Sequence, residues 1–276
     1  MYIDLHIHSI FSDSSRSPEN IVRLAKERNV SFLSICDHSS IAAYPRLISA
    51  CEKAGISQTL GVEVGATLHG EDYDVLAYNF DIRNQAVLQF IRDQKERSDR
   101  ECESMIARMS KEYPALSVED YRVYDRPTEK GGWKYIYYAV DRGIFETYEQ
   151  AGNHIFSNYY VVDPAETYPV EDLCRIVRDA GGVTVLAHPG YIYRRNPETF
   201  REFLQNMHER GIGGIECFYP SHNKEITGSC LDYCRKNNLC ITSGSDCHGD
   251  YDKSEGFTIG SLKITRDMLN LKGIIN

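Results

Sequence analysis

The stretch YIDLHIHSIFSDSS, residues 2–15, alternates apolar and polar residues and then enters a serine-rich segment. Isoleucine and leucine take the odd positions, while His6 and His8 fall on even ones. A period of two predicts a β-strand, because side chains two residues apart project from the same face. Both imidazoles are therefore expected to project together, and Asp13 follows them within a turn.

The next segments alternate between helical and extended patterns. SPENIVRLAKERNV predicts an amphipathic helix with Ser17 as its N-cap and Pro18 in the first position, and SFLSICDHSS predicts a buried strand that ends near His38. A helix over 44–54 and a strand over 58–66 repeat the pattern. Such βαβ units favour an α/β fold with a parallel sheet or barrel, in which loops beyond the carboxyl ends of the strands build the active site.

The pattern changes between about residues 94 and 172. A charged helix, QKERSDRECESMIARMSKEY, precedes a tyrosine-rich stretch that lacks βα alternation. We expect an inserted, mostly helical subdomain over residues 101–168, between α/β parts over 1–100 and 169–276. Its aromatic residues either form a small separate core or cover a substrate. The alternation then resumes with VEDLCRIVRDAGGVTVLAHPG and two later strands that end in polar clusters.

Composition excludes several classes of protein. A net charge of −9 disfavours binding to a long nucleic-acid duplex, because the surface repels polyanions. The sequence has no basic leader and no apolar run of the ~20 residues needed to span a bilayer, so we expect a cytoplasmic protein without membrane contacts. Nine cysteines without C-x-x-C spacing favour reduced, buried thiols over disulfides or structural zinc.

Histidines and carboxylates gather at the ends of the predicted strands. One histidine on an apolar strand is more often a hydrogen-bonded core residue than a ligand. Five of them with carboxylates beside them favour a metal site, because clustered carboxylates repel one another unless a cation lies between them. The residues concerned are His6, His8, Asp13, Asp37, His38, Glu63, His188, Asp246 and His248.

These motifs, taken in order, resemble the PHP (polymerase and histidinol phosphatase) family of metal-dependent phosphoesterases. The resemblance is carried by DLHIHSIFSDSS, SICDHSS, LGVEVGA, VLAHPG and TSGSDCHG. The mid-chain insertion is similar to that of the branch containing nucleoside 3',5'-bisphosphate phosphatases and related 5'-to-3' exonucleases. The resemblance implies a distorted (β/α)7 barrel with metals at the carboxyl ends of its strands.

The resemblance also implies a centre of two to three divalent metal ions. One metal would take His6, His8, Glu63 and Asp246, and Glu63 would bridge to a second metal held by His188. A third would take Asp13, His38 and His248. Mixed nitrogen and oxygen ligands suit manganese, iron or zinc and do not choose among them. Asp37 is expected either to orient a ligand or to cap the next turn.

One ligand position departs from the family pattern. Relatives usually have a histidine in the strand after the bridging glutamate, where EDYDVLAYNFD offers Asp74. His69 lies five residues earlier and is the alternative, but the register of the strand favours Asp74. Ser14 and Ser39 also replace the usual glycine and aspartate, which puts substrate choice in question more than metal binding.

The expected reaction is hydrolysis of a phosphate monoester by a metal-bound hydroxide. Glu63 and Asp246 would hold the metals, and His222 in CFYPSHN is a candidate acid or phosphate ligand, its alternative being an exposed loop residue. Arginines could bind a second phosphate through paired hydrogen bonds, although most arginines on charged helices are merely solvated. The candidates are Arg97, Arg100, Arg142 and either Arg194 or Arg195.

Three functions remain open from the sequence. The leading one is a phosphatase for a small phosphorylated metabolite, such as a nucleoside 3',5'-bisphosphate or a short oligonucleotide end. A histidinol-phosphate phosphatase is the second, and the insertion speaks against it. The third is a non-catalytic domain that keeps metals for structure or ligand sensing, motivated by Asp74 and the altered loops.

Overall fold

The computed structural model describes residues 1–160, 168–251 and 256–275. Its strands form two sheets. The smaller sheet is parallel, with β1 (Tyr2–Ile7), β2 (Val30–Ile35) and β3 (Ser57–Gln58). The larger has the order β4 (Gly61–Leu68), β5 (Glu71–Tyr78), β6 (Val183–Leu186), β7 (Gly214–Phe218) and β8 (Cys240–Ser243).

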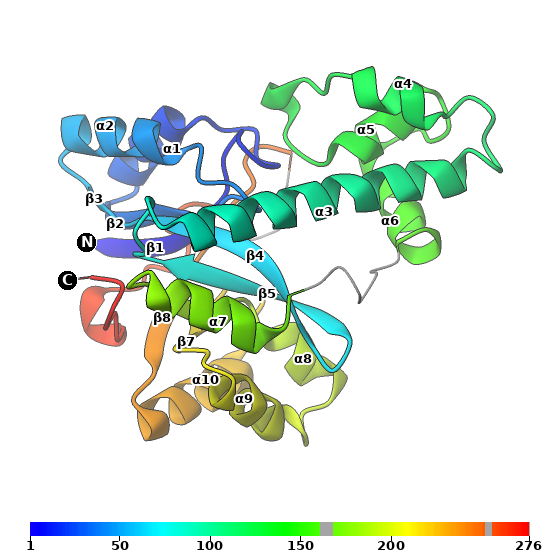
Figure 1. The fold of residues 1–276 in the computed structure, drawn as a ribbon. Coiled ribbons are helices and arrows are strands. Elements are labelled where there is room, and N and C mark those ends of the chain that lie inside the picture. Colours follow the sequence, from blue (N-terminus) through cyan, green and yellow to red (C-terminus); the bar gives the residue numbers. More distant parts are fainter. Residues whose placement is uncertain (161–167, 252–255, 276) are drawn as a thin grey trace.

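Helices cover both sides of these sheets (Figure 1). On one side lie α1 (Pro18–Glu27) and α2 (Tyr44–Ala54), and on the opposite side lie α8 (Gly190–Arg195), α9 (Phe200–Glu209) and α10 (Lys224–Asn237). A third layer is formed by α7 (Val170–Asp179), and a short turn of 3-10 helix, η3 (Arg266–Met268), lies near the carboxyl terminus. The expected cap of α1 is confirmed, because the Ser17 side chain accepts a hydrogen bond from the backbone N–H of Asn20.

The expected α/β class is confirmed, but the strands are not all parallel. A two-residue turn joins β4 to β5 as an antiparallel hairpin, and β5 also pairs antiparallel with β6. Within the larger sheet, the described strands β6, β7 and β8 form the parallel part. The predicted single strand over 58–66 is in fact two strands, since β3 ends at Gln58 and β4 begins at Gly61.

Single bridges link the two sheets at two places. Ile7 at the end of β1 pairs with Cys247, which follows β8, and His38 after β2 pairs with Glu63 in β4. Both bridges lie at the carboxyl ends of strands of the smaller sheet. The candidate ligands that follow these strands are consequently brought to one place.

The insertion is built on one long helix, α3 (Gln85–Met109), which begins before the predicted charged segment. Asn84 starts it, accepting hydrogen bonds from the N–H groups of Ala86 and Val87. Its first turns pack on the main core through Val87 and Phe90. Its last turns belong to a different core.

The second half of α3 packs with three short helices and a turn of 3-10 helix. These are α4 (Val118–Val123), η1 (Thr128–Lys130), α5 (Lys134–Asp141) and α6 (Tyr148–Asn158). Their buried side chains form one cluster between Cys102 and Tyr159 that includes Tyr121, Tyr135 and Tyr138. Many of the aromatic residues thus form a separate core, one of the two predicted alternatives. The subdomain boundary at 101–168 stays a prediction, and residues 161–167 lie outside the described part.

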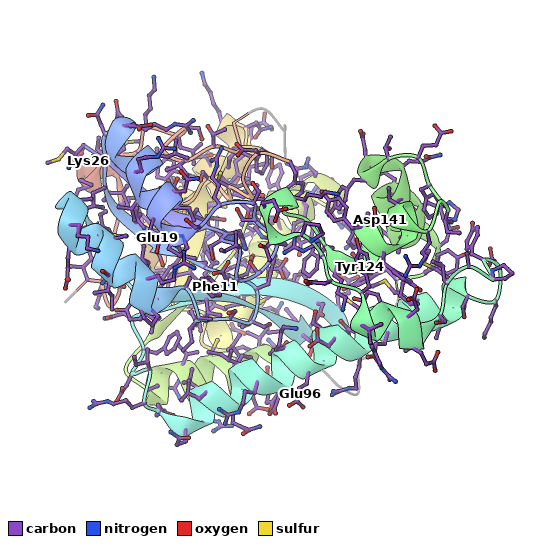
Figure 2. All side chains as sticks on the ribbon, turned by 90° about the horizontal axis from the view of Figure 1, so that it is seen from above. Phe11, Glu19, Lys26, Glu96, Tyr124 and Asp141 are labelled. Carbon is purple, nitrogen blue, oxygen red and sulfur yellow. The ribbon has the colours of Figure 1, made fainter. Side chains whose placement is uncertain are left out.

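Figure 1 shows α3 reaching outward with α4 and α5 above it and α6 below. Figure 2 shows the same helix from above, with Glu96 along it and Tyr124 and Asp141 on the insertion.

All nine cysteines are buried and free, as predicted. In the described part of the chain, no helix is long and apolar enough to cross a membrane.

Candidate metal centre

His6, in β1, and His8, directly after it, project into one buried site. Both are fully buried, and their Nε2 atoms lie 3.1 Å apart. Glu63 Oε2, from β4, lies 3.3 Å from His6 Nε2 and 3.2 Å from His8 Nε2. Asp246 Oδ1, from the loop after β8, lies 3.3 and 3.0 Å from the same two nitrogens. Two nitrogens and two oxygens therefore converge on one point.

This first group fits a metal ion. Metal–ligand bonds of about 2.0–2.2 Å put neighbouring ligand atoms about 3 to 3.5 Å apart, as observed here. Within the described residues, no hydrogen bond of acceptable geometry reaches Glu63 Oε2 or Asp246 Oδ1, two buried atoms of this group. Buried polar atoms are almost always satisfied, so an ion is the expected partner.

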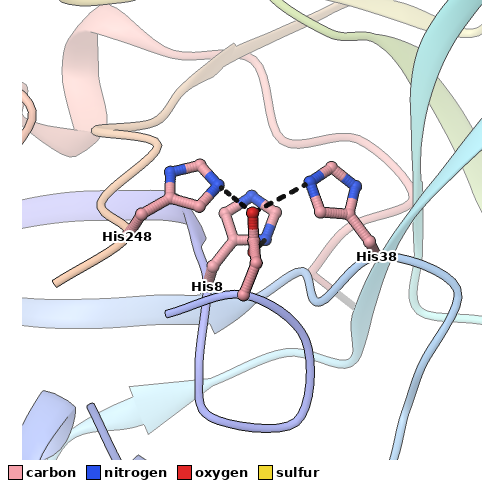
Figure 3. A group of neighbouring side chains, drawn as sticks. His8, His38 and His248 are labelled. Carbon is pink, nitrogen blue, oxygen red and sulfur yellow. Dashed lines mark ion pairs between the residues drawn. The ribbon is translucent and has the colours of Figure 1, made fainter. Parts of the chain in front are cut away.

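A second group surrounds Asp13, on the loop after β1. His248 Nε2 lies 3.3 Å and His38 Nε2 3.8 Å from Asp13 Oδ2. His8 Nδ1 lies 3.6 Å from the other carboxylate oxygen. Figure 3 shows His38 and His248 on either side of a carboxylate oxygen, with His8 beside it. These four residues offer ligand atoms within 4.8 Å of one another.

The third group uses the other oxygen of Glu63. His188 Nε2, from the loop after β6, lies 3.1 Å from Glu63 Oε1 and 3.8 Å from Asp74 Oδ2. Asp74 keeps 46% of its side chain exposed, so this group opens to solvent. The alternative ligand, His69, is exposed in the β4–β5 turn and belongs to none of the three groups.

The electrostatic potential of the site favours cations. Burial opposes protonation of His188, but the hydrogen bond and charge of Glu63 raise its pKa to about 9. Burial likewise opposes protonation of His248, yet Asp13 and Asp246 raise the pKa of its imidazole to about 10. Without metal these histidines hold protons that a metal ion would displace.

Glu216, in β7, was missed by the sequence analysis. It is fully buried; its Oε1 lies 3.1 Å from His6 Nδ1 and its Oε2 accepts from the His188 backbone N–H at 2.9 Å. A carboxylate on the far nitrogen of a ligating histidine fixes the ring orientation and tautomer. The available signal was a glutamate inside the apolar run GIECF.

Other contacts hold the loops that carry ligands. Asp37 accepts hydrogen bonds from the Ser9 N–H and hydroxyl and from the Ser12 hydroxyl, so it fixes the loop that carries Asp13. Supporting a candidate ligand is one of the two expected roles, but the loop concerned precedes Asp37 by about 25 residues, whereas the expected ligand was the neighbouring His38. Tyr219 donates its hydroxyl to Asp246 Oδ2 at 2.7 Å, leaving Oδ1 facing the histidines.

His222 does not have the geometry of the predicted acid or phosphate ligand. Its Nε2 accepts from the Gly190 N–H at 3.0 Å, and its Nδ1 lies 3.2 Å from the Cys217 carbonyl oxygen. Both nitrogens are thus occupied, and burial lowers the pKa of the ring to about 4. The ring is neutral at neutral pH and its one N–H is donated to the Cys217 carbonyl, so these contacts favour a positioning role for His222.

Most of the predicted arginines are already paired with carboxylates. Arg97 is buried between Asp72 and Glu101. Arg142 pairs with Asp120 on the insertion and lines neither cavity beside the ligand groups. The other candidates are also engaged, Arg195 with Glu71, Arg194 with the Ser221 carbonyl, and Arg100 with a partner as well.

A cavity of about 270 Å³ adjoins all three ligand groups. One wall carries His38, Glu63 and Asp74 from the groups. The facing wall comes from the insertion and is aromatic, with Trp133, Tyr135, Phe156 and Tyr160. The centroids of the Trp133 and His38 rings lie 5.3 Å apart.

Comparison with known proteins agrees with this geometry. Residues 4–217 match the PHP domain. The chain belongs to the PHP domain family. The matched segment begins in β1 and ends in β7, so it includes seven of the nine PHP ligand candidates but not Asp246 and His248.

Several PHP relatives resemble the chain over most of its length. A phosphoribosyl 1,2-cyclic phosphate 1,2-diphosphodiesterase from Eggerthella lenta is 26% identical, covering 92% of this chain and 96% of the relative. The 5'-3' exoribonuclease Rnm of Escherichia coli is 25% identical, covering 89% and 84%. A 3',5'-nucleoside bisphosphate phosphatase from Chromobacterium violaceum is 23% identical, covering 93% and 91%.

The fold also matches a solved PHP-type structure. A protein from Bifidobacterium adolescentis, described as a candidate metal-dependent phosphoesterase, superposes with a TM-score of 0.76 at 25% identity, covering 91% of this chain and 89% of that one. Family, fold and ligand groups together identify the protein as a hydrolase, a metal-dependent PHP phosphoesterase.

Proposed function

We propose that this phosphoesterase removes a phosphate from a small nucleotide, with a nucleoside 3',5'-bisphosphate as the first candidate substrate. The observation that carries the proposal is the aromatic cavity beside the ligand groups. We also propose that the nine predicted ligands hold two to three ions of manganese, iron or zinc at the rim of a distorted (β/α)7 barrel. The two single bridges between the sheets support that architecture.

The size and lining of the cavity favour a single nucleotide. About 270 Å³ lies near the lower end of the range for small-molecule sites. Flat aromatic faces such as Trp133 and Tyr135 stack well on a nucleobase, a contact that tolerates any base. If the base of the nucleotide stacks on the insertion, its sugar phosphate points toward His38 and Glu63.

The chain's own residues would hold the ions and orient them. When bound, the ions would supply positive charge that polarises the phosphoryl group and lowers the pKa of a water molecule. Glu63 gives one oxygen to the first group and the other to the third, so it ties the two together. Glu216 fixes the His6 ring, and Tyr219 fixes the Asp246 carboxylate.

Two relatives are named for cleaving other phosphate bonds, and those reactions are the competing outcomes of the test. The Eggerthella lenta and Escherichia coli relatives are named for cleavage of phosphodiesters. A diester substrate would need the same ligand groups, so the test has to identify the bond that breaks.

The test is a comparison of products from manganese-loaded protein. Substrates are adenosine 3',5'-bisphosphate, AMP, histidinol phosphate, a 5'-phosphorylated trinucleotide RNA and a ribose 1,2-cyclic phosphate. The proposal predicts phosphate and one adenosine monophosphate from the bisphosphate, with kcat/KM at least tenfold above the other substrates. Release of mononucleotides from RNA, or preferential opening of the cyclic ester, would replace this proposal by diester cleavage.

Two variants show whether the activity belongs to this site. Asp246→Asn removes a charged oxygen from the first group and should abolish turnover. Asp81→Asn is the matched control, because Asp81 is an exposed carboxylate paired with Arg83 and surface pairs contribute little. Metal-dependent thermal stability without turnover of any substrate would instead support the non-catalytic alternative.

A further inference from the structure

Arg126, on the loop before η1, is a cation that the sequence analysis did not select. It donates hydrogen bonds to the backbone carbonyls of Gly132 and Ser12. A guanidinium has five N–H donors, so several remain. Among the described residues, no carboxylate forms an ion pair with it, in contrast to Arg97 and Arg142.

The contacts of Arg126 put it next to the second ligand group. Ser12 directly precedes Asp13, and the Gly132 N–H donates to the Asp13 carbonyl at 2.5 Å. Arg126 therefore links the loop of the insertion to the loop that carries a candidate ligand. Its position is set by both parts of the protein.

Arg126 lines a second cavity, of about 190 Å³, next to the first. The two cavities share His38, Ser39, Ser98, Cys102, Trp133 and Tyr135, so they meet beside His38 of the second ligand group. One ligand bound at the metals could extend into both.

The two cavities differ in charge. Among the described residues, the first is lined by the carboxylates of Asp72, Asp74, Glu63 and Glu101 and by one cation, Arg97. In the same part of the chain, the second is lined by Lys95, Arg126 and Lys134 and by one carboxylate, Asp99. An anionic group away from the metals would be repelled by the first cavity and attracted by the second.

The cations of the second cavity are not equally available. Lys95 already pairs with Asp99. Lys134 lies over the Tyr121 ring at 4.7 Å and donates to the Arg122 carbonyl. Arg126 has a planar fork of donors that suits phosphate oxygens, and its present partners are neutral.

We propose that Arg126 binds the second phosphate of the substrate, the one that is not hydrolysed, and so selects bisphosphates over monophosphates. This inference rests on the proposed nucleotide phosphatase function. The positive charges of Lys95 and Lys134 also attract a phosphate to this subsite. Trp133 lines both cavities, so a base stacked on it would lie beside this subsite.

The test compares Arg126→Gln and Arg126→Lys on two substrates, adenosine 3',5'-bisphosphate and AMP. Loss of a charged, paired hydrogen bond should raise KM for the bisphosphate by about 10- to 100-fold while kcat changes little. The kcat/KM for AMP should stay within about twofold, since AMP has no second phosphate to lose. Arg126→Lys should recover part of the affinity.

Arg122→Gln is the matched control. Arg122 lies in the same region of the insertion, is exposed, and pairs with Glu103 rather than lining the cavity. It should leave both substrates unchanged. If Arg126 only holds the loops together, Arg126→Gln would reduce turnover of both substrates equally and lower Tm, and that result overturns the inference.

A binding measurement separates this inference from the proposed function. Titration calorimetry of EDTA-treated protein gives the Kd of the bisphosphate and of adenosine, which has no phosphate, without turnover. Preference for the bisphosphate should disappear in Arg126→Gln, and a preference that persists overturns the subsite. Wild-type protein that binds the bisphosphate through Arg126 but does not hydrolyse it would overturn the proposed function alone.

Discussion

His8 belongs to two of the three ligand groups, but a neutral imidazole has one lone pair to give. Its Nε2 lies 3.0 Å from Asp246 and 3.2 Å from Glu63, whereas its Nδ1 is 3.6 Å from Asp13. The shorter contacts assign the lone pair to the first group and leave an N–H toward Asp13. The second group then consists of Asp13, His38 and His248, the set that the family resemblance implies.

Asp74 and His69 give a direct test of the third group. Asp74→Asn should lower the metal content by about one equivalent, because a neutral amide is a weaker ligand than a carboxylate. His69→Asn should leave it unchanged, since His69 lies in the exposed turn of the hairpin. Metal analysis after gel filtration measures both, and equal loss in the two variants would contradict the assignment of Asp74.

Glu216 is expected to act through His6 and His188 rather than on substrate. Glu216→Gln should weaken metal binding by about 10- to 100-fold, the usual cost of losing such an outer partner. Activity should fall at limiting manganese and recover in part at excess manganese.

The control for Glu216 is Glu209→Gln, an exposed glutamate that accepts a hydrogen bond from Gln205. It should bind manganese as the wild type does. A Glu216→Gln protein that has full metal content but no activity at any manganese concentration would argue that Glu216 acts on the reaction itself.

Sequence patterns predicted ligands better than they predicted their supports. Histidines and carboxylates at strand ends are visible because the pattern of each strand is local. The partner of His6 is Glu216, 210 residues away, and only the order of strands in the sheet brings them together. Arg126 was missed because nothing local distinguishes it from a solvated arginine.

At the level of elements, the β4–β5 hairpin is the main departure from prediction. Its register sets Gly65 opposite Asp74. This pairing brings Asp74 into the ligand group that contains Glu63 of β4. The turn residues His69 and Gly70 both have positive φ, of 54° and 82°. A two-residue turn of that kind between extended runs is typical of a hairpin, so the signal in TLHGED was present but was outweighed by the βαβ pattern.

The turn at Gly131 and Gly132 sets the insertion against the loop that carries Asp13. Gly131 has φ of +66°, and a Cβ there would lie 2.3 Å from the Tyr251 ring and 2.9 Å from Ser15 N. Gly131→Ala should therefore shift the neighbouring Trp133 and raise KM for nucleotides several-fold. Trp133 is the single tryptophan, so its fluorescence and acrylamide quenching report the shift directly.

Gly143→Ala separates backbone strain from the clash. Gly143 has φ of +73°, but a Cβ there meets nothing within 4 Å. Both variants should lose about 1–3 kcal/mol of stability from the left-handed backbone. Only Gly131→Ala should change tryptophan quenching and KM, and identical effects in the two variants would contradict a role for this turn in the site.

At the scale of the whole molecule, the metal groups join segments from both sheets. His6 comes from the smaller sheet, with His8 just beyond it, Glu63 from the larger sheet, and Asp246 from the loop beyond β8. Bound ions would therefore add to a contact between the sheets that single bridges and a shared hydrophobic cluster already make. The sequence predicted this convergence through the α/β pattern, but not the division into two ladders.

Removal of metal should lower Tm by roughly 5–10 °C, as expected for a ligand present at 100 to 1,000 times its Kd in a protein of this size. Calorimetry with EDTA and after return of manganese measures the change. Asp246→Asn is the control, since a disrupted first group should show a smaller response. An unchanged Tm in the wild type would indicate that the ions do not bridge the sheets.

The unbroken α3 has a consequence for engineering and for divergence among relatives. It contacts the main core at Val87 and the insertion core at Met109, with Arg97 between them. One residue added to the helix midway would rotate everything beyond it by about 100°. Trp133 would then turn away from His38, so a functional graft of this insertion onto another scaffold would have to preserve helical phase rather than linker length.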